Sequence, residues 1–295
     1  MLHRAYYALP DWRNRSGEAT AGVYGFLSML LKAIDELKPT HLIIVFDMPE
    51  PTFRHLMYVG YQHNREKERQ VSEDIWGQVE KLKVVFKKME VPVFTSAGFE
   101  ADDVIGTLAS QITGFFSSTP SVSPPRLGGE EKGGSEAVII TGDKDLMQLV
   151  NNKVKLFMPQ KGLSDGILVD REKVFEKLGV WPEQVVEYKA LVGDSSDNYP
   201  GIPGIGPVTA KKLLAEFGTF EEVVKKAGVQ KIIDGYESGE LSKRLATIRR
   251  DVPVSMTNDQ CTIPNKDTMM KVFEELGYKS LVRRTEVIKP QQSLF

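Results

Sequence analysis

Eight acidic residues of this chain lie next to segments that are typical of buried strands or helix starts. They occupy four places along the sequence: Asp47; Glu100, Asp102 and Asp103; Asp143 and Asp145; Asp194 and Asp197. Carboxylates brought together repel one another, so a site built from them requires cations. Oxygen ligands in this number, without His or Cys, select magnesium or manganese. The pattern therefore predicts a site with two or more divalent ions, which is suited to phosphodiester hydrolysis.

Each of these acidic residues has an ordinary explanation when it is taken alone. A single carboxylate after a strand usually caps a helix or forms a turn. The repetition is what favours a metal site, because three of the runs carry carboxylates two or three residues apart and Asp47 ends an apolar run of its own. This spacing lets both carboxylates of a run reach one ion from a turn or a helix start.

The surrounding sequence predicts alternating helices and strands. Three stretches have apolar residues at helical spacing, namely 21–37, 75–89 and 101–112. Three short apolar runs are typical of buried strands, namely 42–46, 91–95 and 137–140. Asp47 and Asp143 each follow one of these runs, at the end where open parallel sheets bind their ligands. We therefore expect an α/β domain with the acidic residues at one edge of its sheet.

Two segments depart from this alternation. Residues 48–76 interleave aromatic and basic side chains with little apolar periodicity. Such a segment suits a mobile element that grips a nucleic-acid backbone and, equally, an ordinary solvated helix and loop. Residues 114–136 are rich in Ser, Pro and Gly, so they cannot bury enough surface to order themselves and are expected to form a flexible surface insert.

A second chemical signal is the glycine-rich stretch that follows the last acidic pair. Gly204-Ile205-Gly206 predicts a tight hairpin before a helix, and Lys211 and Lys212 follow about one turn later. Backbone N–H groups at a helix N-terminus bind phosphate without reading bases. The stretch therefore predicts a sequence-independent grip on a DNA backbone, and the alternative is a structural glycine turn between two helices.

Composition narrows the class of protein. With 41% apolar residues, a chain of 295 residues can build a sizeable core. Its one cysteine, Cys261, excludes an internal disulfide and fits a reducing cytosol. The longest apolar runs are too short to span a bilayer, so no membrane partner is expected. The net charge is −2, but 32 acids against 38 bases remain once the eight carboxylates are set aside as neutralised by metal, which suits phosphate contacts.

Taken together, the motifs resemble the 5′-3′ exonuclease domain of bacterial DNA polymerase I, within the flap endonuclease family. They occur in the family's order over nearly the whole chain: Arg4–Leu9, Val45–Asp47, Phe53–His55, Glu100–Asp103, Thr141–Leu146, Gly193–Asn198 and the glycine hairpin. The resemblance implies a PIN-like (resolvase-like) α/β nuclease domain over 1–171, with a parallel sheet flanked by helices and a helical arch at about 48–76. It further implies a helical domain with a helix–hairpin–helix DNA clamp over 172–288.

The resemblance also implies roles for individual residues. The residues expected at one divalent ion are Asp47, Glu100 and Asp102, with Asp103 beside it. Those expected at the second are Asp143, Asp145, Asp194 and Asp197. The scissile or flanking phosphate is expected to contact Arg4, Arg54 and Arg65. The expected DNA contacts are Phe53, His55 and Tyr61 in the arch and Gly204, Gly206, Lys211 and Lys212 at the hairpin, where a monovalent cation is also expected.

The activity that the resemblance implies is magnesium- or manganese-dependent hydrolysis of DNA or RNA-primer 5′ ends by a 5′-3′ exonuclease or flap endonuclease. A metal-bound hydroxide would attack the phosphodiester, and both ions would stabilise the developing charge. The expected substrate is DNA with a 5′ flap, nick or primer end, bound by a monomer in the bacterial cytoplasm at the nucleoid. A PIN-type ribonuclease would share the acidic residues, but not the glycine hairpin or the arch.

Two departures from the family pattern affect this expectation. The family normally begins with a buried strand that ends in Asp-Gly and supplies a metal ligand, whereas Met1 stands after the position of that strand. The chain is therefore expected to leave a sheet neighbour unpaired and to bind metal more weakly. An upstream start would restore both features, and the alternative function is that of a non-catalytic or impaired DNA-binding adaptor. In the arch, Gln62 follows Tyr61 where relatives usually have Lys.

The C-terminal tail, 289–295, resembles a bacterial sliding-clamp-binding peptide. A glutamine precedes a terminal Ser-Leu-Phe, and the residues expected to contact the clamp are Gln291, Leu294 and Phe295. A frayed terminus is the alternative. The same ending leads us to expect a stand-alone nuclease chain without a polymerase domain.

Overall fold

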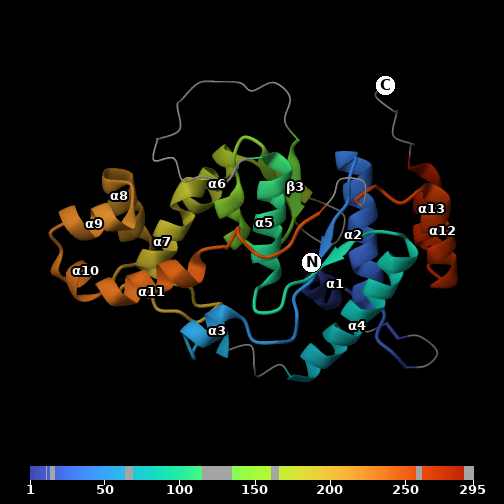
Figure 1. The fold of residues 1–295 in the computed structure, drawn as a ribbon, viewed down its shortest axis with the longest axis horizontal. Coiled ribbons are helices and arrows are strands. Elements are labelled where there is room, and N and C mark those ends of the chain that lie inside the picture. The colour runs from blue at the N-terminus through green and yellow to red at the C-terminus, as the bar shows by residue number, and fades with distance from the viewer. Residues whose placement is uncertain are drawn as a thin grey trace.

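The computed structural model describes residues 1–10, 12–13, 17–63, 69–114, 135–160, 166–256 and 261–288. Figure 1 shows an elongated molecule with helices at both ends and the strands near its middle. The expected surface insert falls outside the described residues except at its two ends. Four residues with expected functions also fall outside them: Arg65, Gln291, Leu294 and Phe295.

One half of the molecule is built from helices around a short parallel pair of strands. Its elements are α1 (Leu2–Ala8), α2 (Ala21–Leu37), β1 (Ile44–Val45), α4 (Arg69–Lys88), β2 (Val93–Phe94), α12 (Lys266–Glu275) and α13 (Lys279–Val287). Helix α2 has the bounds that its apolar spacing predicts. It ends at Lys38, whose backbone is left-handed with φ 47°, directly before Pro39. Apolar side chains of these elements share one core, with Leu27, Leu82 and Phe86 fully buried.

The other half combines a second small sheet with a run of short helices. Strand β3 (Ala137–Ile140) pairs in parallel with β4 (Val154–Pro159), which pairs antiparallel with β5 (Gly166–Val169). Helix α5 (Ala101–Thr113) and the 3-10 helix η2 (Asp145–Leu149) pack beside this sheet. The helices that follow are α6 (Arg171–Leu178), η3 (Pro182–Gln184), α7 (Val185–Val192), α8 (Pro207–Phe217), α9 (Phe220–Lys226), α10 (Gln230–Asp234) and α11 (Tyr236–Ala246). Sheet and helices share a second core.

The last two helices return to the first half of the molecule. Although α12 and α13 lie within the predicted helical domain, 172–288, they pack against α4 and α2. Figure 1 shows them at the end of the molecule opposite to α8, α9 and α10. The helical unit beside the second sheet therefore consists of α6 to α11. No helix in the described part of the chain is long and apolar enough to cross a membrane.

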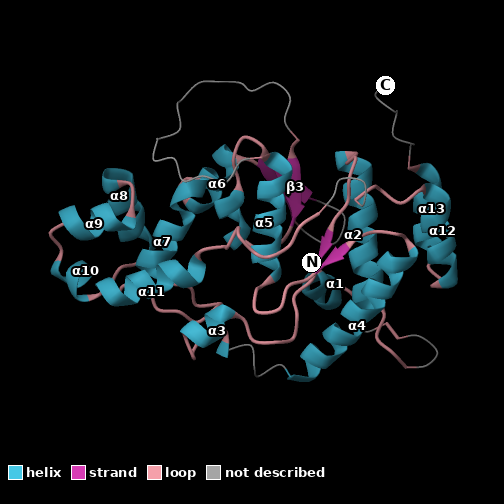
Figure 2. Ribbon diagram, in the orientation of Figure 1, coloured by secondary structure: helices cyan, strands magenta, loops and turns pink. Residues whose placement is uncertain are grey.

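The predicted α/β architecture is present, with its sheet in two parts. Among the described residues, β1 pairs only with β2 and β3 is joined only to β4, so each has one edge without a neighbouring strand. Figure 2 shows the strands as two separate groups. A cavity of about 1450 Å³ reaches both groups, and its apolar lining includes Phe26, Leu30, Ile44, Val138 and Ile140. The two large cores lie in the two halves, and a smaller cluster joins them, in which Val104 and Leu108 of α5 pack against Val45 and Phe94 of the first strand pair.

Candidate metal centre

Three of the predicted metal ligands meet where β1 ends and α5 begins. Asp47 lies two residues after β1, and its Oδ1 accepts a hydrogen bond from the N–H of Ala101 at 2.8 Å. Glu100 is the N-cap of α5, and Asp102 lies in the first turn of that helix. The partial positive charge at a helix N-terminus favours carboxylates there. The local fold thus holds all three carboxylates at the carboxyl end of β1.

The surroundings of these groups disfavour their charged forms. Asp102 is half-buried, and burial raises its pKa well above the usual range, with a further increase from the carboxylates of Asp143 and Asp47. Burial also raises the pKa of Glu100 to about 7, while Arg54 opposes the increase. Like charges in a partly buried site produce such shifts, and a bound cation reverses them.

A second group of carboxylates comes from η2 and from the loop after α7. Asp145, Asp194 and Asp197 each offer one oxygen atom, and these atoms lie within 4.8 Å of one another. The N–H of Asp145 donates to Oδ1 of Asp143 at 2.9 Å, which places the Asp143 carboxylate beside the start of η2. Asp194 is held by a two-way backbone bridge to Tyr199, with N···O distances of 2.9 and 3.0 Å.

The two groups form one cluster. The carboxylate of Asp102 interacts electrostatically with those of Asp143 and Asp145, and the carboxylate of Glu100 with that of Asp197. Seven of the eight predicted metal ligands are therefore brought together: Asp47, Glu100, Asp102, Asp143, Asp145, Asp194 and Asp197. The donor set consists of carboxylate oxygen atoms alone, which fits hard divalent cations such as magnesium and manganese.

Lys189 belongs to this cluster, although no sequence motif reveals it. It lies on α7 with a side chain that is 11% exposed, and its Nζ donates to Asp194 Oδ2 at 2.6 Å and to Asp145 Oδ1. Burial raises the pKa of Asp145 to about 6 in spite of this ion pair. Burial acts in the same direction on Asp194, but Lys189 and the hydrogen bonds from Ser196 hold its pKa at about 2. The sequence offers only its position, five residues before Asp194, as a sign that Lys189 could lie near that carboxylate.

Asp103 and Arg54 form a buried ion pair that borders the cluster at Glu100, whose Oε2 lies 3.1 Å from Arg54 Nη1. Both side chains are fully buried, and two parallel hydrogen bonds of 2.7 and 2.8 Å join them. Asp103 also accepts the N–H of Arg249 at 2.8 Å, and Arg54 donates to the carbonyl oxygens of Leu245 and Thr247. These contacts hold both side chains in a buried network, and the expected roles of Asp103 beside a metal ion and of Arg54 at a phosphate stay predictions.

The expected arch contacts also pack into the base of the site. Tyr61 is 4% exposed and donates to Glu100 Oε2 at 3.2 Å. His55 lies in α3 (Phe53–Met57), where its Nδ1 accepts the N–H of Thr52 at 3.2 Å. Phe53 contacts Phe99 with ring centroids 5.9 Å apart. These side chains are therefore placed to hold the arch against the carboxylates.

The arch is also joined to the loop that carries the last acidic pair. The N–H of Gln62 donates to the carbonyl oxygen of Asp197 at 2.9 Å. The side-chain amide of Asn198 donates to the carbonyl oxygen of Gly60 at 2.6 Å. Gln62, which departs from the family pattern, thus touches the metal-site loop through its backbone. A movement of the arch base would act directly on this loop.

Two positive groups of the N-terminus lie near the first carboxylates. Arg4 is half-buried on α1, lines the same cavity and donates to the carbonyl oxygen of Gln160. The α-amino group of Met1 has a pKa lowered by burial, with the carboxylates of Asp102 and Asp47 acting in the opposite direction. Arg4 thus lines the cavity that Asp47 and Asp102 also line, and its expected contact with a phosphate stays a prediction.

The glycine hairpin forms as predicted and leads into α8. Gly204 has φ 81°, a backbone conformation that glycine adopts without strain, and Gly206 is the N-cap before Pro207. Ile205 is buried in the second core and anchors the turn. Lys212 is exposed, whereas the half-buried Lys211 extends beside Gly179. The N-terminus of α8 is thus presented to solvent on a fixed turn.

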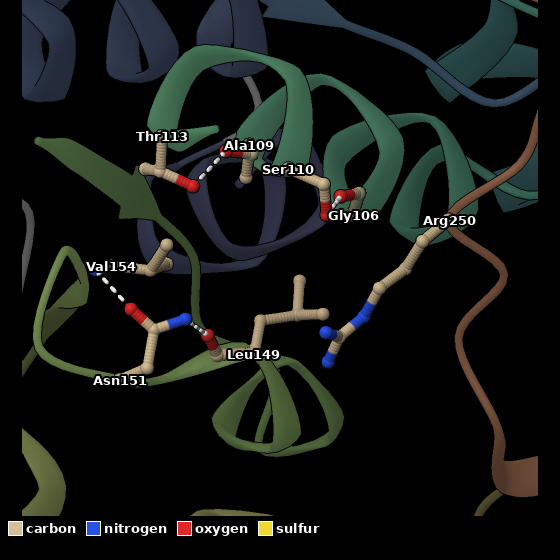
Figure 3. Close-up of a pocket in the computed structure, with 8 residues that line it drawn as sticks. All are labelled: Gly106, Ala109, Ser110, Thr113, Leu149, Asn151, Val154 and Arg250. Carbon is tan, nitrogen blue, oxygen red and sulfur yellow. Dashed lines mark hydrogen bonds between the residues drawn. The ribbon is translucent and has the colours of Figure 1, made fainter. Parts of the chain in front are cut away.

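The small pocket drawn in Figure 3 is a packing defect between α5 and η2. Its volume is about 10 Å³, close to what one water molecule needs. Its polar groups bond to one another: Ser110 Oγ donates to the carbonyl oxygen of Gly106 at 2.7 Å, and Asn151 Oδ1 accepts the N–H of Val154 at 3.0 Å. It offers no room for a substrate.

Comparison with known proteins yields matches to both halves of the chain. Residues 1–121 match the family model of the 5′-3′ exonuclease N-terminal resolvase-like domain, and residues 180–269 that of the 5′-3′ exonuclease C-terminal SAM fold. DNA polymerase I of Bacillus caldotenax is 36% identical over 295 residues, which cover 97% of this chain and 31% of the relative. DNA polymerase I of Bacillus subtilis is 34% identical over 293 residues, which cover 96% of this chain and 31% of that relative. The chain thus spans about a third of the length of these relatives.

Solved structures share the fold at low sequence identity. A bacteriophage T5 flap endonuclease in a complex with DNA and metal ions has a TM-score of 0.59 at 19% identity, covering 89% of this chain and 90% of that one. The catalytic core of Rad2 with a DNA substrate has a TM-score of 0.57 at 16% identity, covering 92% and 87%. Since both family domains match in order, the chain belongs to the 5′-3′ exonuclease family.

Proposed function

We propose that this chain is a divalent-metal-dependent 5′-3′ exonuclease and flap endonuclease that hydrolyses DNA or RNA-primer 5′ ends in bacterial replication and repair. The observation that carries the proposal is the meeting of seven carboxylates from four distant segments, three of which have oxygen atoms within 4.8 Å of one another. Family membership, with bacterial DNA polymerases among the relatives, supports the reaction, its polarity and its place in the cytoplasm at the nucleoid.

The cluster fits magnesium or manganese. Besides the all-oxygen donor set, a buried tyrosine supports a bound group. Tyr199 is 4% exposed, and its hydroxyl has no hydrogen-bond partner among the described atoms. Burial raises the pKa of this hydroxyl, and the carboxylates of Asp145 and Asp194 raise it further. A buried polar group without a partner is unfavourable, so a further group is expected beside it. Bound ions would activate water and neutralise charge that develops on the phosphodiester.

The chain's own residues supply binding and orientation in this proposal. Arg4 contacts a phosphate of the substrate, a role that its position on the lining of the shared cavity supports, while the N–H groups at the exposed start of α8 and Lys212 hold the duplex backbone. These contacts do not read bases, so substrate choice follows the shape of the DNA end. Structural neighbours crystallised with DNA support a DNA substrate. The monovalent cation at the hairpin, the monomeric state and clamp binding by the tail remain predictions.

Cleavage of a labelled 5′-flap duplex tests the function, with magnesium, with manganese and with a chelator. Asp145→Ala and Asp197→Ala should each lower the rate at least about a hundredfold, because each removes one oxygen ligand from the closely spaced group. Asp35→Ala, on the exposed face of α2, is the matched control and should cut normally. Near-normal cutting by both site variants would refute the metal assignment.

A non-catalytic DNA-binding adaptor is the second candidate, and the divided sheet favours it. The cavity opens at Asp47, Asp102 and Asp143, so these carboxylates lack the support that a continuous sheet would give them. Tight flap binding without cutting, in either metal, would support the adaptor over the nuclease.

A further inference from the structure

A turn that requires glycine brings Asp194 to the side chain of Lys189. Helix α7 ends at Val192, and Gly193 turns the chain with φ 72°. A Cβ at Gly193 would lie 2.4 Å from the carbonyl oxygen of Tyr199, so no other residue fits without a shift of the backbone. The turn brings the carboxylate of Asp194 back over the last turn of α7, facing the Nζ of Lys189.

The two oxygen atoms of Asp194 have different partners. Oδ1 accepts the N–H of Ser196 at 2.7 Å and its hydroxyl at 2.6 Å. Oδ2 accepts the ammonium group of Lys189 at 2.6 Å. The N–H of Asp197 also donates to Oδ1, at 3.4 Å. Since Oδ1 already receives three hydrogen bonds, Oδ2 is the oxygen that Asp194 can offer to an ion, and the ammonium group of Lys189 contacts it.

The same ammonium group contacts Asp145. Its Nζ therefore bridges two of the three carboxylates whose oxygen atoms lie within 4.8 Å of one another. Divalent ions bind carboxylate oxygens at about 2.0–2.6 Å, and a lysine ammonium is a compact point charge. A divalent ion and the ammonium group of Lys189 cannot both lie between Asp145 and Asp194, because they would overlap and their like charges would repel.

We propose that Lys189 is an internal counter-ion that fills the place of a divalent ion between Asp145 and Asp194 and competes with that ion for both carboxylates. The inference rests on the proposed metal site and adds a residue that governs its affinity. The ammonium group carries one charge against three nearby carboxylates, so the cluster remains attractive to a divalent ion. Metal binding then requires the Lys189 side chain to leave its two partners.

Manganese binding to the full chain without DNA tests the competition, for example by electron paramagnetic resonance of the unbound ion. Lys189→Met keeps the apolar stem and removes the charge, so it should bind manganese at least about tenfold more tightly than the wild-type chain. In a chelator, the same variant should melt at a lower temperature, because the carboxylates then lack their counter-ion. Lys189→Gln, which keeps a hydrogen-bond donor, should fall between the two.

Lys243→Met is the matched control. Lys243 also bridges two carboxylates, those of Glu187 and Glu221, but these lie outside the cluster. This variant should melt at a lower temperature without any change in manganese affinity. Unchanged or weaker manganese binding by both Lys189 variants would overturn the inference.

The metal site itself is tested separately by Asp197→Ala. If manganese binds equally well to the wild-type chain and to Asp197→Ala, the proposed metal site fails, and the inference fails with it. If Asp197→Ala loses manganese while both Lys189 variants bind it as the wild-type chain does, the metal site stands and only the competition is refuted.

Discussion

At the scale of single residues, the carboxylates of the site differ in their surroundings. Seven face one another, with Lys189 and Arg54 at the edge of the cluster as their positive partners, whereas Asp103 is joined to Arg54 by two buried hydrogen bonds. Removing one partner of a buried ion pair leaves the other charge uncompensated, which is far more damaging than losing an exposed pair. Asp103 is therefore expected to act through stability, although it is adjacent in sequence to Asp102.

Asp103→Asn tests this division. We expect the variant to lose about 3 kcal/mol of unfolding free energy, measured by urea denaturation, because the buried Arg54 loses its two-bond partner and keeps only Glu100 as a counter-charge. Asp251→Asn, which removes an exposed ion pair with Arg249, should change stability by no more than about 0.5 kcal/mol. Normal stability of Asp103→Asn combined with weakened manganese binding would instead assign Asp103 to the metal, as the sequence predicts.

The pKa of Glu100 gives a pH dependence with a definite sign. In the folded chain this pKa is raised to about 7 from an ordinary value of 4.5, chiefly by burial, so the folded state binds more protons than the unfolded state between these values. Stability then falls as the pH rises through that window. In a chelator, the melting temperature should decrease from about pH 4.5 to pH 7, and Glu100→Gln should flatten the decrease. A melting temperature that rises over this range would contradict the assignment.

At the scale of elements, the helices occur where their spacing predicts them, whereas two of the three predicted strands are shorter than their apolar runs. Helix α2 and strand β3 have the predicted bounds, but the apolar run 42–46 yields only the short strand β1, Ile44–Val45. The backbone hydrogen bonds of a helix form between its own residues, so the local sequence largely determines its length. A strand forms its backbone hydrogen bonds with a neighbouring strand, so its length depends on that neighbour. The contacts of Lys189 and Arg54 were unpredictable for a related reason: their partners come from distant turns whose approach no local pattern encodes.

The start of α8 is the element expected to hold the DNA backbone. Lys212→Gln should weaken duplex binding several-fold and uniformly across sequences, and should lower the slope of log affinity against log salt by about one, since one phosphate contact is lost. Fluorescence anisotropy at several salt concentrations measures both quantities. Lys87→Gln, exposed in the last turn of α4, is the control and should leave both unchanged. Equal effects of the two substitutions would mean that α8 makes no special contact.

At the scale of the whole molecule, the metal centre lies where two separate cores meet. The first core contributes Asp47 after β1, and the second contributes Asp143 after β3 and Asp145 in η2. The cavity between them reaches the free edges of both strands, so little of the sheet holds the two sets of carboxylates at a fixed separation. Catalytic geometry has to be maintained within a fraction of an ångström. We therefore expect the packing at this junction to influence the metal affinity and the turnover rate of the proposed nuclease.

An apolar strand placed in this junction should raise the stability of the fold and the rate of the proposed cleavage. We expect an N-terminal extension of about six β-branched residues ending in Asp-Gly before Met1 to pair with β1 and β3, fill the apolar cavity and add one carboxylate to the cluster. The melting temperature and the rate of flap cleavage should both rise. The same extension ending in Asn-Gly fills the cavity but adds no carboxylate to the cluster. It should therefore raise the melting temperature without raising the rate of cleavage. An extension with a central proline cannot donate to the sheet and should raise neither. If all three extensions behave alike in melting and cleavage assays, the strand does not enter the cavity and the two cores function as they stand.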